Sequence, residues 1–359
     1  MLNPRLSVST LPSYHPPLAG REGLRLDFNE NTVGCSPRVL ECLRSIGGEQ
    51  LARYPEREPV EALIAEHWQL APEEVLLTNG IDEAIHLLCE TYLEPEDEVL
   101  IPVPTFAMYE LFAAATGAKI VKVQASDDFE IPTQDLLGTI SEKTRLIVIA
   151  NPNNPTGTVV EPEILLEVAR SAPRAAVLVD EAYFEFFGET LLGQWRTAPN
   201  LVVARTFSKA YGLAGLRVGV LAGDASVIAS VRRMASPYSV NGVALACLPA
   251  ALQDDEYVLT YAAQVRQNRE KLQDQLREWG VRFWPSRANF VLLHVGKLHS
   301  ELVRAMRSQG ILVRDRSKDP GCEGCIRVTV GSAQQTKCLI EALGVALTAF
   351  GILKRELSR

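Results

Sequence analysis

The sequence lacks the features of a membrane or secreted protein. No uncharged apolar run reaches the roughly 20 residues that a membrane-spanning helix needs. The first residues show no basic stretch followed by an apolar core, so no signal peptide is apparent. The seven cysteines are scattered and odd in number, which does not suit a disulfide framework. These absences predict a cytoplasmic protein without membrane contact.

An excess of positive charge and the spacing patterns of metal ligands are also missing. The formal net charge is −8 at pH 7, which argues against a nucleic-acid-binding surface. Cys322 and Cys325 form a CxxC pair, but no second pair exists to complete a zinc site. His294 and His299 have no partners at metal-ligand spacing. We therefore predict no bound metal, with a turn at the cysteine pair.

The chain does contain enough apolar residues for a large core. Of its 359 residues, 47% are hydrophobic and 22% are charged, which predicts more than one domain. Between about residues 75 and 223, short apolar runs alternate with helical patterns. This alternation is typical of a mostly parallel sheet with helices on both faces. The last run, at residues 218–222, is predicted as an antiparallel edge or returning strand. Such sheets bind ligands at the carboxyl ends of their strands.

Other parts of the chain are organised differently. Residues 1–25 are rich in Pro, Ser and Gly, which predicts an extended arm. A helix is expected at residues 37–46, because Ser36 can cap it and Pro37 suits its first turn. A long helix is predicted at residues 254–279, and a strand at 281–284 belongs to a second, smaller domain.

One lysine lies in an unusual setting, within the segment ARTFSKAYGLAGLRVG at residues 204–219. Lys209 follows a short apolar run, with Thr206 and Ser208 beside it and Arg217 eight positions later. A lysine amine can form a Schiff base with an aldehyde, and hydroxyls with an arginine can bind a phosphate. The group indicates pyridoxal 5′-phosphate (PLP). In isolation, such a lysine is more often a surface residue.

A second segment suits the same phosphate. Residues 75–78 read as a strand, Asn79 and Gly80 as a turn, and residues 81–92 as an amphipathic helix. The first N–H groups of a helix and its dipole attract anions. The backbone N–H groups of Gly80, Ile81 and Asp82 are therefore predicted to bind the phosphate of PLP.

Residues after three further strands suit the ring of PLP. Phe106 follows the strand at residues 98–101 and can stack on a flat ring, with Tyr109 as second choice and a core position as the alternative. Asp180, at the end of the strand at 175–179, can pair with the ring nitrogen and favour a carbanion on the substrate. Two further side chains can bind the ring 3′-oxygen, namely Asn154 and Tyr183.

Several of these segments resemble one known family. NPNNPTG at residues 151–157, VDEAYFEF at 179–186, SKAYGLAGLRVG and IRVTVG follow one another in the family's order. Together with NENTVGCSP and RYPE near the start, they resemble the PLP-dependent aminotransferases of fold type I. Within that group the chain is most similar to the histidinol-phosphate aminotransferases.

The resemblance implies a particular architecture. It is an α/β fold with a mostly parallel seven-stranded sheet in a large domain and a smaller α+β domain. Residues 1–28 would form an N-terminal arm, 29–47 part of the small domain, 48–255 the large PLP-binding domain and 256–359 the small C-terminal domain. The family also implies a homodimer with a shared active site.

The resemblance further implies roles for residues outside the central segments. Tyr54 would bind the PLP phosphate of the other subunit, and Tyr14 would reach a substrate, unless it is a packing residue of the arm. Arg314 and Arg327 would hold the anionic end of the substrate, with a surface ion pair as the alternative for Arg314. Two loop residues would lie near the same substrate, namely Asn31 and Asn289. Relatives carry a Pro-Tyr or similar pair where this chain has Thr32 and Val33, so the shape of this loop stays open.

The implied activity is the transamination of L-histidinol phosphate with 2-oxoglutarate, in histidine biosynthesis. Lys209 would carry PLP and move the proton, assisted by Asp180 and Tyr183. Two alternatives share the cofactor, an aromatic amino-acid aminotransferase and a threonine-phosphate decarboxylase. A regulator that carries an extra DNA-binding domain does not suit this acidic chain.

Overall fold

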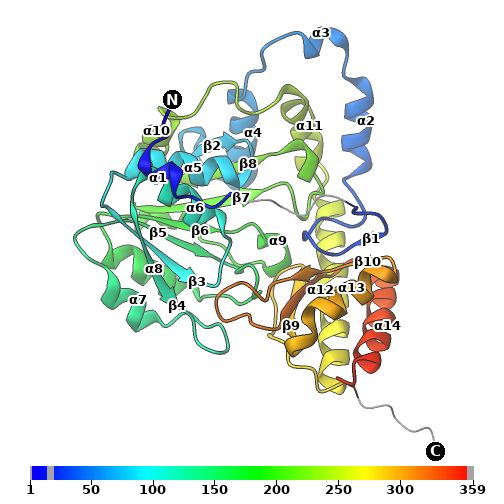
Figure 1. Cartoon of the computed structure of the whole chain (residues 1–359). Coiled ribbons are helices and arrows are strands. Elements are labelled where there is room, and N and C mark those ends of the chain that lie inside the picture. Colours follow the sequence, from blue (N-terminus) through cyan, green and yellow to red (C-terminus); the bar gives the residue numbers. More distant parts are fainter. Residues whose placement is uncertain (1, 14–19, 354–359) are drawn as a thin grey trace, which may run out of the picture.

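The computed structural model describes residues 2–13 and 20–353 (Figure 1). The predicted α/β fold is confirmed by a sheet of seven strands in the order β2, β8, β7, β6, β5, β3, β4. Their bounds are β2 Val75–Thr78, β3 Glu98–Val103, β4 Lys119–Gln124, β5 Thr144–Ala150, β6 Ala176–Asp180, β7 Leu201–Thr206 and β8 Gly219–Gly223.

Six of these strands run in one direction, and only β8 is antiparallel to both of its neighbours. The antiparallel prediction for this run is correct. Of the two alternatives predicted for it, an edge or a returning strand, the edge position is wrong, because β8 lies between β2 and β7, and β2 forms the edge. Pairing with β2 supplies hydrogen bonds along both sides of β8, and all five of its residues are buried.

Helices cover both faces of the sheet. Successive strand residues point to opposite faces. In β5, Leu146 and Val148 therefore pack in a cluster with helices α5 Gly80–Tyr92, α6 Met108–Thr116 and α10 Ala225–Arg232. Ile147 and Ile149 pack in the other cluster, with α7 Thr133–Thr139 and α8 Pro162–Ser171. This double cover explains why β5 is almost continuously apolar.

Further helices lie outside these two clusters. They are α2 Pro37–Ser45, α3 Gly48–Leu51, α4 Glu58–Trp68, α9 Phe184–Phe187 and α11 Gly242–Leu252. Helix α2 begins as predicted: the Ser36 hydroxyl accepts a hydrogen bond from the Arg38 N–H at 3.1 Å, and Pro37 occupies the first turn. Helix α2 packs against α11. Short 3₁₀ turns lie at η1 Pro72–Glu74, η2 Gln194–Arg196, η3 Ala214–Leu216 and η4 Gly296–Leu298.

The smaller unit is assembled around the long helix α12 Asp255–Glu278, shown in yellow in Figure 1. Its antiparallel sheet has the order β11 Arg314–Asp315, β12 Cys325–Thr329, β9 Phe290–His294. Helices α13 His299–Ser308 and α14 Ala333–Ala349 complete it. The strand predicted at residues 281–284 is wrong, because only Phe283 forms an isolated bridge, with Leu293.

The N-terminal arm contacts both units. It starts with a short helix, α1 Leu6–Ser9, where the sequence predicted only extended chain. The Ser7 hydroxyl donates to the Ala115 carbonyl of α6 at 3.0 Å. Further along, β1 Leu24–Arg25 pairs in parallel with β10 Ile311–Leu312 of the smaller unit. The arm therefore leads the chain from the large sheet to the smaller unit and into the loop that follows β1.

The part of the chain that the structure describes holds neither a membrane-spanning helix nor a cluster of possible metal ligands. No helix there is long and apolar enough to cross a membrane. No group of three or more His, Cys, Asp or Glu side chains in that part could hold a metal ion.

Candidate active site

A cavity of about 170 Å³ lies at the carboxyl ends of β5, β6 and β7, beside the start of α5. Strand ends converge here because the strands are parallel, so residues that follow different strands meet at one edge of the sheet. Most residues that the sequence assigned to PLP line this cavity: Ile81, Asp82, Phe106, Asn154, Asp180, Tyr183, Thr206, Ser208, Lys209 and Arg217.

One end of the cavity suits an anion. The Ser208 hydroxyl is buried and, within the described residues, has no hydrogen-bond partner. Gly80 opens α5 with a φ of +76°, and a Cβ atom there would lie 2.5 Å from Nη2 of Arg217. That guanidinium also donates to Asp82 at 3.1 Å. A buried donor without a partner is costly, so a phosphate that accepts from Ser208 fits this corner.

Thr206 serves a different purpose from Ser208. Its hydroxyl donates to the Val218 carbonyl at 3.3 Å and accepts from the Ser208 N–H at 3.1 Å. The Thr206 hydroxyl is therefore engaged within the loop that carries the lysine. This loop geometry leaves Ser208 as the hydroxyl free to bind a ligand.

Asp180 forms the inner wall. It is buried, and its carboxylate accepts hydrogen bonds from the Tyr109 hydroxyl at 2.5 Å and the Ala182 N–H at 2.9 Å. Burial raises the pKa of Asp180 to about 6, although these two bonds oppose the shift. The group is therefore mostly a carboxylate at pH 7, as pairing with a protonated ring nitrogen requires.

Phe106 and Tyr109, the two candidates for stacking on the ring of PLP, make different contacts. Phe106 lines the cavity, and its ring meets Tyr109 edge-on at 5.6 Å between centroids. Tyr109, the second choice for stacking, is fully buried with its hydroxyl on Asp180. The sequence analysis missed this contact. The spacing of three residues along the start of α6 placed both rings in one region but could not show the partner of the hydroxyl.

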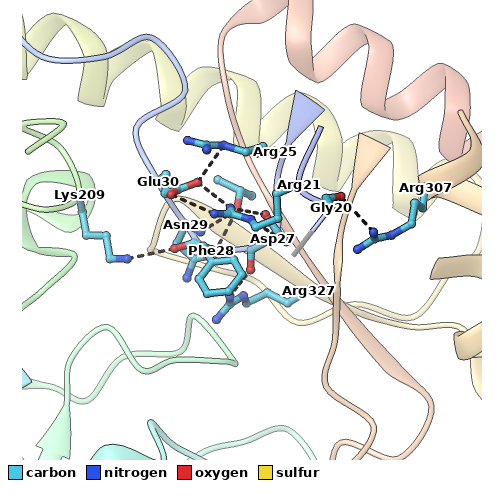
Figure 2. Close-up of polar contacts among 11 residues, drawn as sticks. Gly20, Arg21, Arg25, Asp27, Phe28, Asn29, Glu30, Lys209, Arg307 and Arg327 are labelled. Atoms are coloured by element: carbon cyan, nitrogen blue, oxygen red, sulfur yellow. Dashed lines mark hydrogen bonds and ion pairs between the residues drawn. The ribbon is translucent and has the colours of Figure 1, made fainter. Parts of the chain in front are cut away.

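Lys209 lies on the side of the cavity that faces the loop after β1 (Figure 2). Its amine donates to the Phe28 carbonyl at 3.1 Å. Burial lowers the pKa of Lys209 to about 8, and the positive charges of Arg327 and Arg217 contribute to the shift. A lysine with a depressed pKa is partly neutral near pH 7 to 8, which suits a nucleophile or a base.

Asn29 is a second residue that the sequence analysis missed. Its side chain donates to the Tyr183 hydroxyl at 3.0 Å and accepts from Thr329 at 3.2 Å. The loop around it was expected to lie near the substrate, but the contact with Tyr183 joins residues 154 positions apart. Burial raises the pKa of Tyr183, so its phenol stays protonated and available as a donor.

Arg327 and Arg314 stand opposite each other on adjacent strands β12 and β11. The Arg327 guanidinium donates to the side-chain oxygen of Asn154 and to the Asp27 carbonyl at 2.8 Å, and its Nε, within the described residues, has no partner. Burial, together with Arg316, lowers the pKa of Arg327 to about 9. Arg314 lies over the Phe28 ring, 5.2 Å from its centroid. Neither arginine lines the cavity itself, and two neighbouring cations would suit an anion.

Other predicted residues do not reach the cavity. The Tyr54 side chain is 79% exposed and packs on Tyr238 at 4.5 Å between ring centroids. Asn31 donates to the Ala210 carbonyl at 2.9 Å, and Asn289 donates to the Asn29 carbonyl at 3.1 Å, so both hold loops together. Tyr14 lies outside the described residues.

A reactive lysine, a buried carboxylate and an anion-binding helix start, all at one edge of such a sheet, define a PLP-dependent enzyme of fold type I. Residues 21–343 match the family model described as aminotransferase class I and II, and the chain belongs to this family. It is therefore a PLP-dependent aminotransferase that acts on small amino and keto-acid substrates.

The chain is similar in sequence and structure to several histidinol-phosphate aminotransferases. The chain is 38% identical over 332 residues to a histidinol-phosphate aminotransferase of Symbiobacterium thermophilum, covering 90% of each chain. It is 35% identical to one of Roseiflexus castenholzii, covering 94% of this chain and 96% of the other. The crystal structure of the Sinorhizobium meliloti histidinol-phosphate aminotransferase in complex with pyridoxal-5′-phosphate matches with a TM-score of 0.86 and 25% identity, over 96% of this chain and 98% of that one.

Proposed function

We propose that this protein is a histidinol-phosphate aminotransferase, which transfers the amino group of L-histidinol phosphate to 2-oxoglutarate in histidine biosynthesis. The observation that carries the proposal is the pairing of Arg314 and Arg327 across β11 and β12. Two guanidinium groups suit a phosphate dianion, which accepts hydrogen bonds from both. The names of the relatives support the same substrate.

The residues of the cavity fit PLP as a set. Lys209 would hold it covalently, while Ser208, Arg217 and the N–H groups of residues 80–82 would bind its phosphate. The ring would lie against Phe106. Asp180 would face its nitrogen, and two donors would bind its 3′-oxygen, namely Tyr183 and Asn154. When bound, PLP supplies the electron sink that stabilises negative charge on the substrate carbon that bears the amine.

The chain itself supplies binding and proton transfer. Arg327 and Arg314 hold the phosphate end of the substrate and thereby fix the amine-bearing carbon near Lys209. The Lys209 amine, with its pKa lowered to about 8, takes the proton from that carbon at Nζ. Asn31 and Asn289 keep the loops beside the site in shape through their bonds to Ala210 and Asn29.

The proposal includes a homodimer in the cytoplasm. Tyr54 and Tyr238 are 79% and 55% exposed and lie together, and large exposed aromatic side chains in contact suit an interface with a second copy. There Tyr54 would contribute to the phosphate site of the partner. The cytoplasmic location is supported by the seven cysteines, all of which are free thiols.

The test compares substrates on the purified, PLP-loaded enzyme. L-histidinol phosphate, L-phenylalanine and L-threonine phosphate are mixed with it separately, and the absorbance of the lysine-bound cofactor is followed. We expect rapid conversion to the pyridoxamine form with histidinol phosphate alone. Conversion with phenylalanine but not with histidinol phosphate would show that the proposed substrate is wrong. Release of carbon dioxide from threonine phosphate would show that the reaction is a decarboxylation and not a transamination.

A further inference from the structure

Two active-site cations rest on consecutive backbone carbonyls of the loop after β1. Arg327 donates to the Asp27 carbonyl at 2.8 Å, and the Lys209 amine donates to the Phe28 carbonyl at 3.1 Å. Figure 2 shows both contacts converging on this segment, residues 27–30. The position of these carbonyl oxygens therefore decides where the lysine amine and the guanidinium lie.

The 27–30 segment has no helix or strand to define its shape. It lies between β1 and α2, and Asn29 has a φ of 56°, a left-handed conformation that non-glycine residues adopt rarely. Hydrogen bonds from core residues hold Asn29, and the Arg314 guanidinium lies over the Phe28 ring, 5.2 Å from its centroid. The Asn29 N–H donates to Thr329 at 3.1 Å, and the Asn29 carbonyl accepts from Asn289 at 3.1 Å. Other contacts must fix the residues on either side of Asn29.

Arg21 makes those contacts. Its guanidinium binds both carboxylate oxygens of Asp27, at 2.8 and 3.2 Å, and one oxygen of Glu30 at 2.8 Å. The same group lies over the Phe28 ring, 4.3 Å from its centroid. The Arg21 side chain is only 10% exposed, so these bonds are shielded from water. Arg25 reaches Glu30 only at 3.5 Å and is half exposed.

We propose that Arg21 is a positioning residue of the active site. By binding Asp27, Phe28 and Glu30, it fixes the two carbonyl oxygens that hold the Lys209 amine and the Arg327 guanidinium. These contacts are with the loop after β1, so Arg21 would act through Lys209 and Arg327. The proposal rests on the proposed function in one respect: Lys209 is the lysine that carries PLP and moves the proton.

The chemistry of the Phe28 carbonyl gives a measurable consequence. A carbonyl that accepts from an ammonium stabilises the charged form, so loss of this contact lowers the pKa of the lysine. The charged groups that act on Lys209 are Arg327, Arg217, Glu30 and Asp82. A double variant, Arg21→Met with Asp27→Asn, removes one charge of each sign and leaves those four side chains unsubstituted.

The experiment measures the reactivity of Lys209 in the full-length chain freed of PLP. Acetic anhydride modifies only neutral amines, so the pH midpoint of Lys209 labelling, followed by peptide mass spectrometry, reports its pKa. We expect a midpoint near 8 for the parent enzyme and about one pH unit lower for the double variant. Arg21→Lys keeps the charge but loses the bidentate geometry, and we expect a smaller shift in the same direction.

Arg25→Met is the matched control. It also removes a guanidinium beside Glu30, but Arg25 has no bond to Asp27 and no contact with the Phe28 ring, so we expect an unchanged midpoint. An unchanged midpoint in Arg21→Lys and in the double variant, with thermal unfolding like that of the parent, would overturn the proposal. If the double variant does not fold, Arg21→Lys decides alone.

A second measurement uses the loaded enzyme. Turnover is compared between histidinol phosphate and the same substrate deuterated at the amine-bearing carbon. A misplaced lysine slows proton transfer from that carbon. We expect the double variant to show a rate roughly tenfold lower and a larger isotope effect. General destabilisation would not raise the isotope effect. If the parent enzyme forms no lysine-bound cofactor band, the proposed function fails, whereas the labelling midpoint still judges the role of Arg21.

Discussion

The hydroxyl of Tyr109 donates a 2.5 Å hydrogen bond to the carboxylate of Asp180 at the inner wall of the cavity. The two residues are 71 positions apart, on α6 and at the end of β6. Both are buried, so the bond is shielded from water and partly offsets the cost of burying the carboxylate. The pair ties the protonation state of Asp180 to a hydroxyl group on α6.

This relationship predicts a pH effect. Tyr109→Phe removes a bond that lowers the pKa of Asp180, so that pKa should rise above about 6. If the carboxylate is the active form, activity is lost as the pH falls through this value. The acid limb of the activity profile should therefore move to higher pH in Tyr109→Phe. An acid limb that stays in place would show that Asp180 does not set it.

Replacement of Lys209 tests the central assignment. Lys209→Ala should bind PLP without the absorbance band of the lysine-bound cofactor. Its turnover should fall by roughly 10²- to 10⁴-fold or more, because the group that transfers the proton is lost. Lys337→Ala is a suitable control, since that side chain is 68% exposed and lies on α14. Turnover in Lys209→Ala close to that of the parent would refute the assignment.

Because the Ser208 hydroxyl has no hydrogen-bond partner within the described residues, we expect its removal to lower the affinity for PLP without lowering the stability of the cofactor-free protein. Ser208→Ala should lower PLP affinity by roughly 10- to 100-fold, as expected for a lost hydrogen bond to a charged phosphate. The unfolding free energy of the cofactor-free protein should not fall, because this hydroxyl has no partner among the described residues. The measurements are cofactor titration and urea unfolding.

Thr206→Val is the matched comparison for Ser208→Ala. In the parent protein, the Thr206 hydroxyl donates to the Val218 carbonyl and accepts from the Ser208 N–H. We expect this variant to lose about 1 kcal/mol of stability in the cofactor-free protein. Equal losses of stability in the two variants would mean that Ser208 also has a structural role.

The facing arginines predict a change in substrate preference. Arg314→Gln removes one cation from the site and leaves Arg327, with its bonds to Asn154 and Asp27, in place. KM for histidinol phosphate should rise by roughly 10- to 100-fold, while cofactor binding stays unchanged. Steady-state kinetics and cofactor titration check the two parts. An unchanged KM would mean that Arg314 contributes only its contact with the Phe28 ring.

The sequence predicted the fold well where apolar runs are unambiguous. The strands of the large sheet stand out because a strand buried on both faces is almost wholly apolar, as in β5. The position of β8 in the sheet was not predictable, because an antiparallel strand can pair on either side. The residues of the run do not indicate which strands pair with it. The run at residues 281–284 has the composition of a strand but forms only one bridge, at Phe283.

Local patterns in the sequence are enough to predict which chemical groups meet at the cavity. Lys209, Asp180 and Asn154 follow strands, and the carboxyl ends of parallel strands lie at one edge of a sheet whatever the loops do. The tertiary structure alone decided the contacts that tune these groups. The bonds from Lys209 to Phe28, from Tyr109 to Asp180 and from Asn29 to Tyr183 join residues 181, 71 and 154 positions apart. Their geometry depends on how the loop after β1 and helix α6 pack against the sheet, and local sequence patterns do not encode that packing.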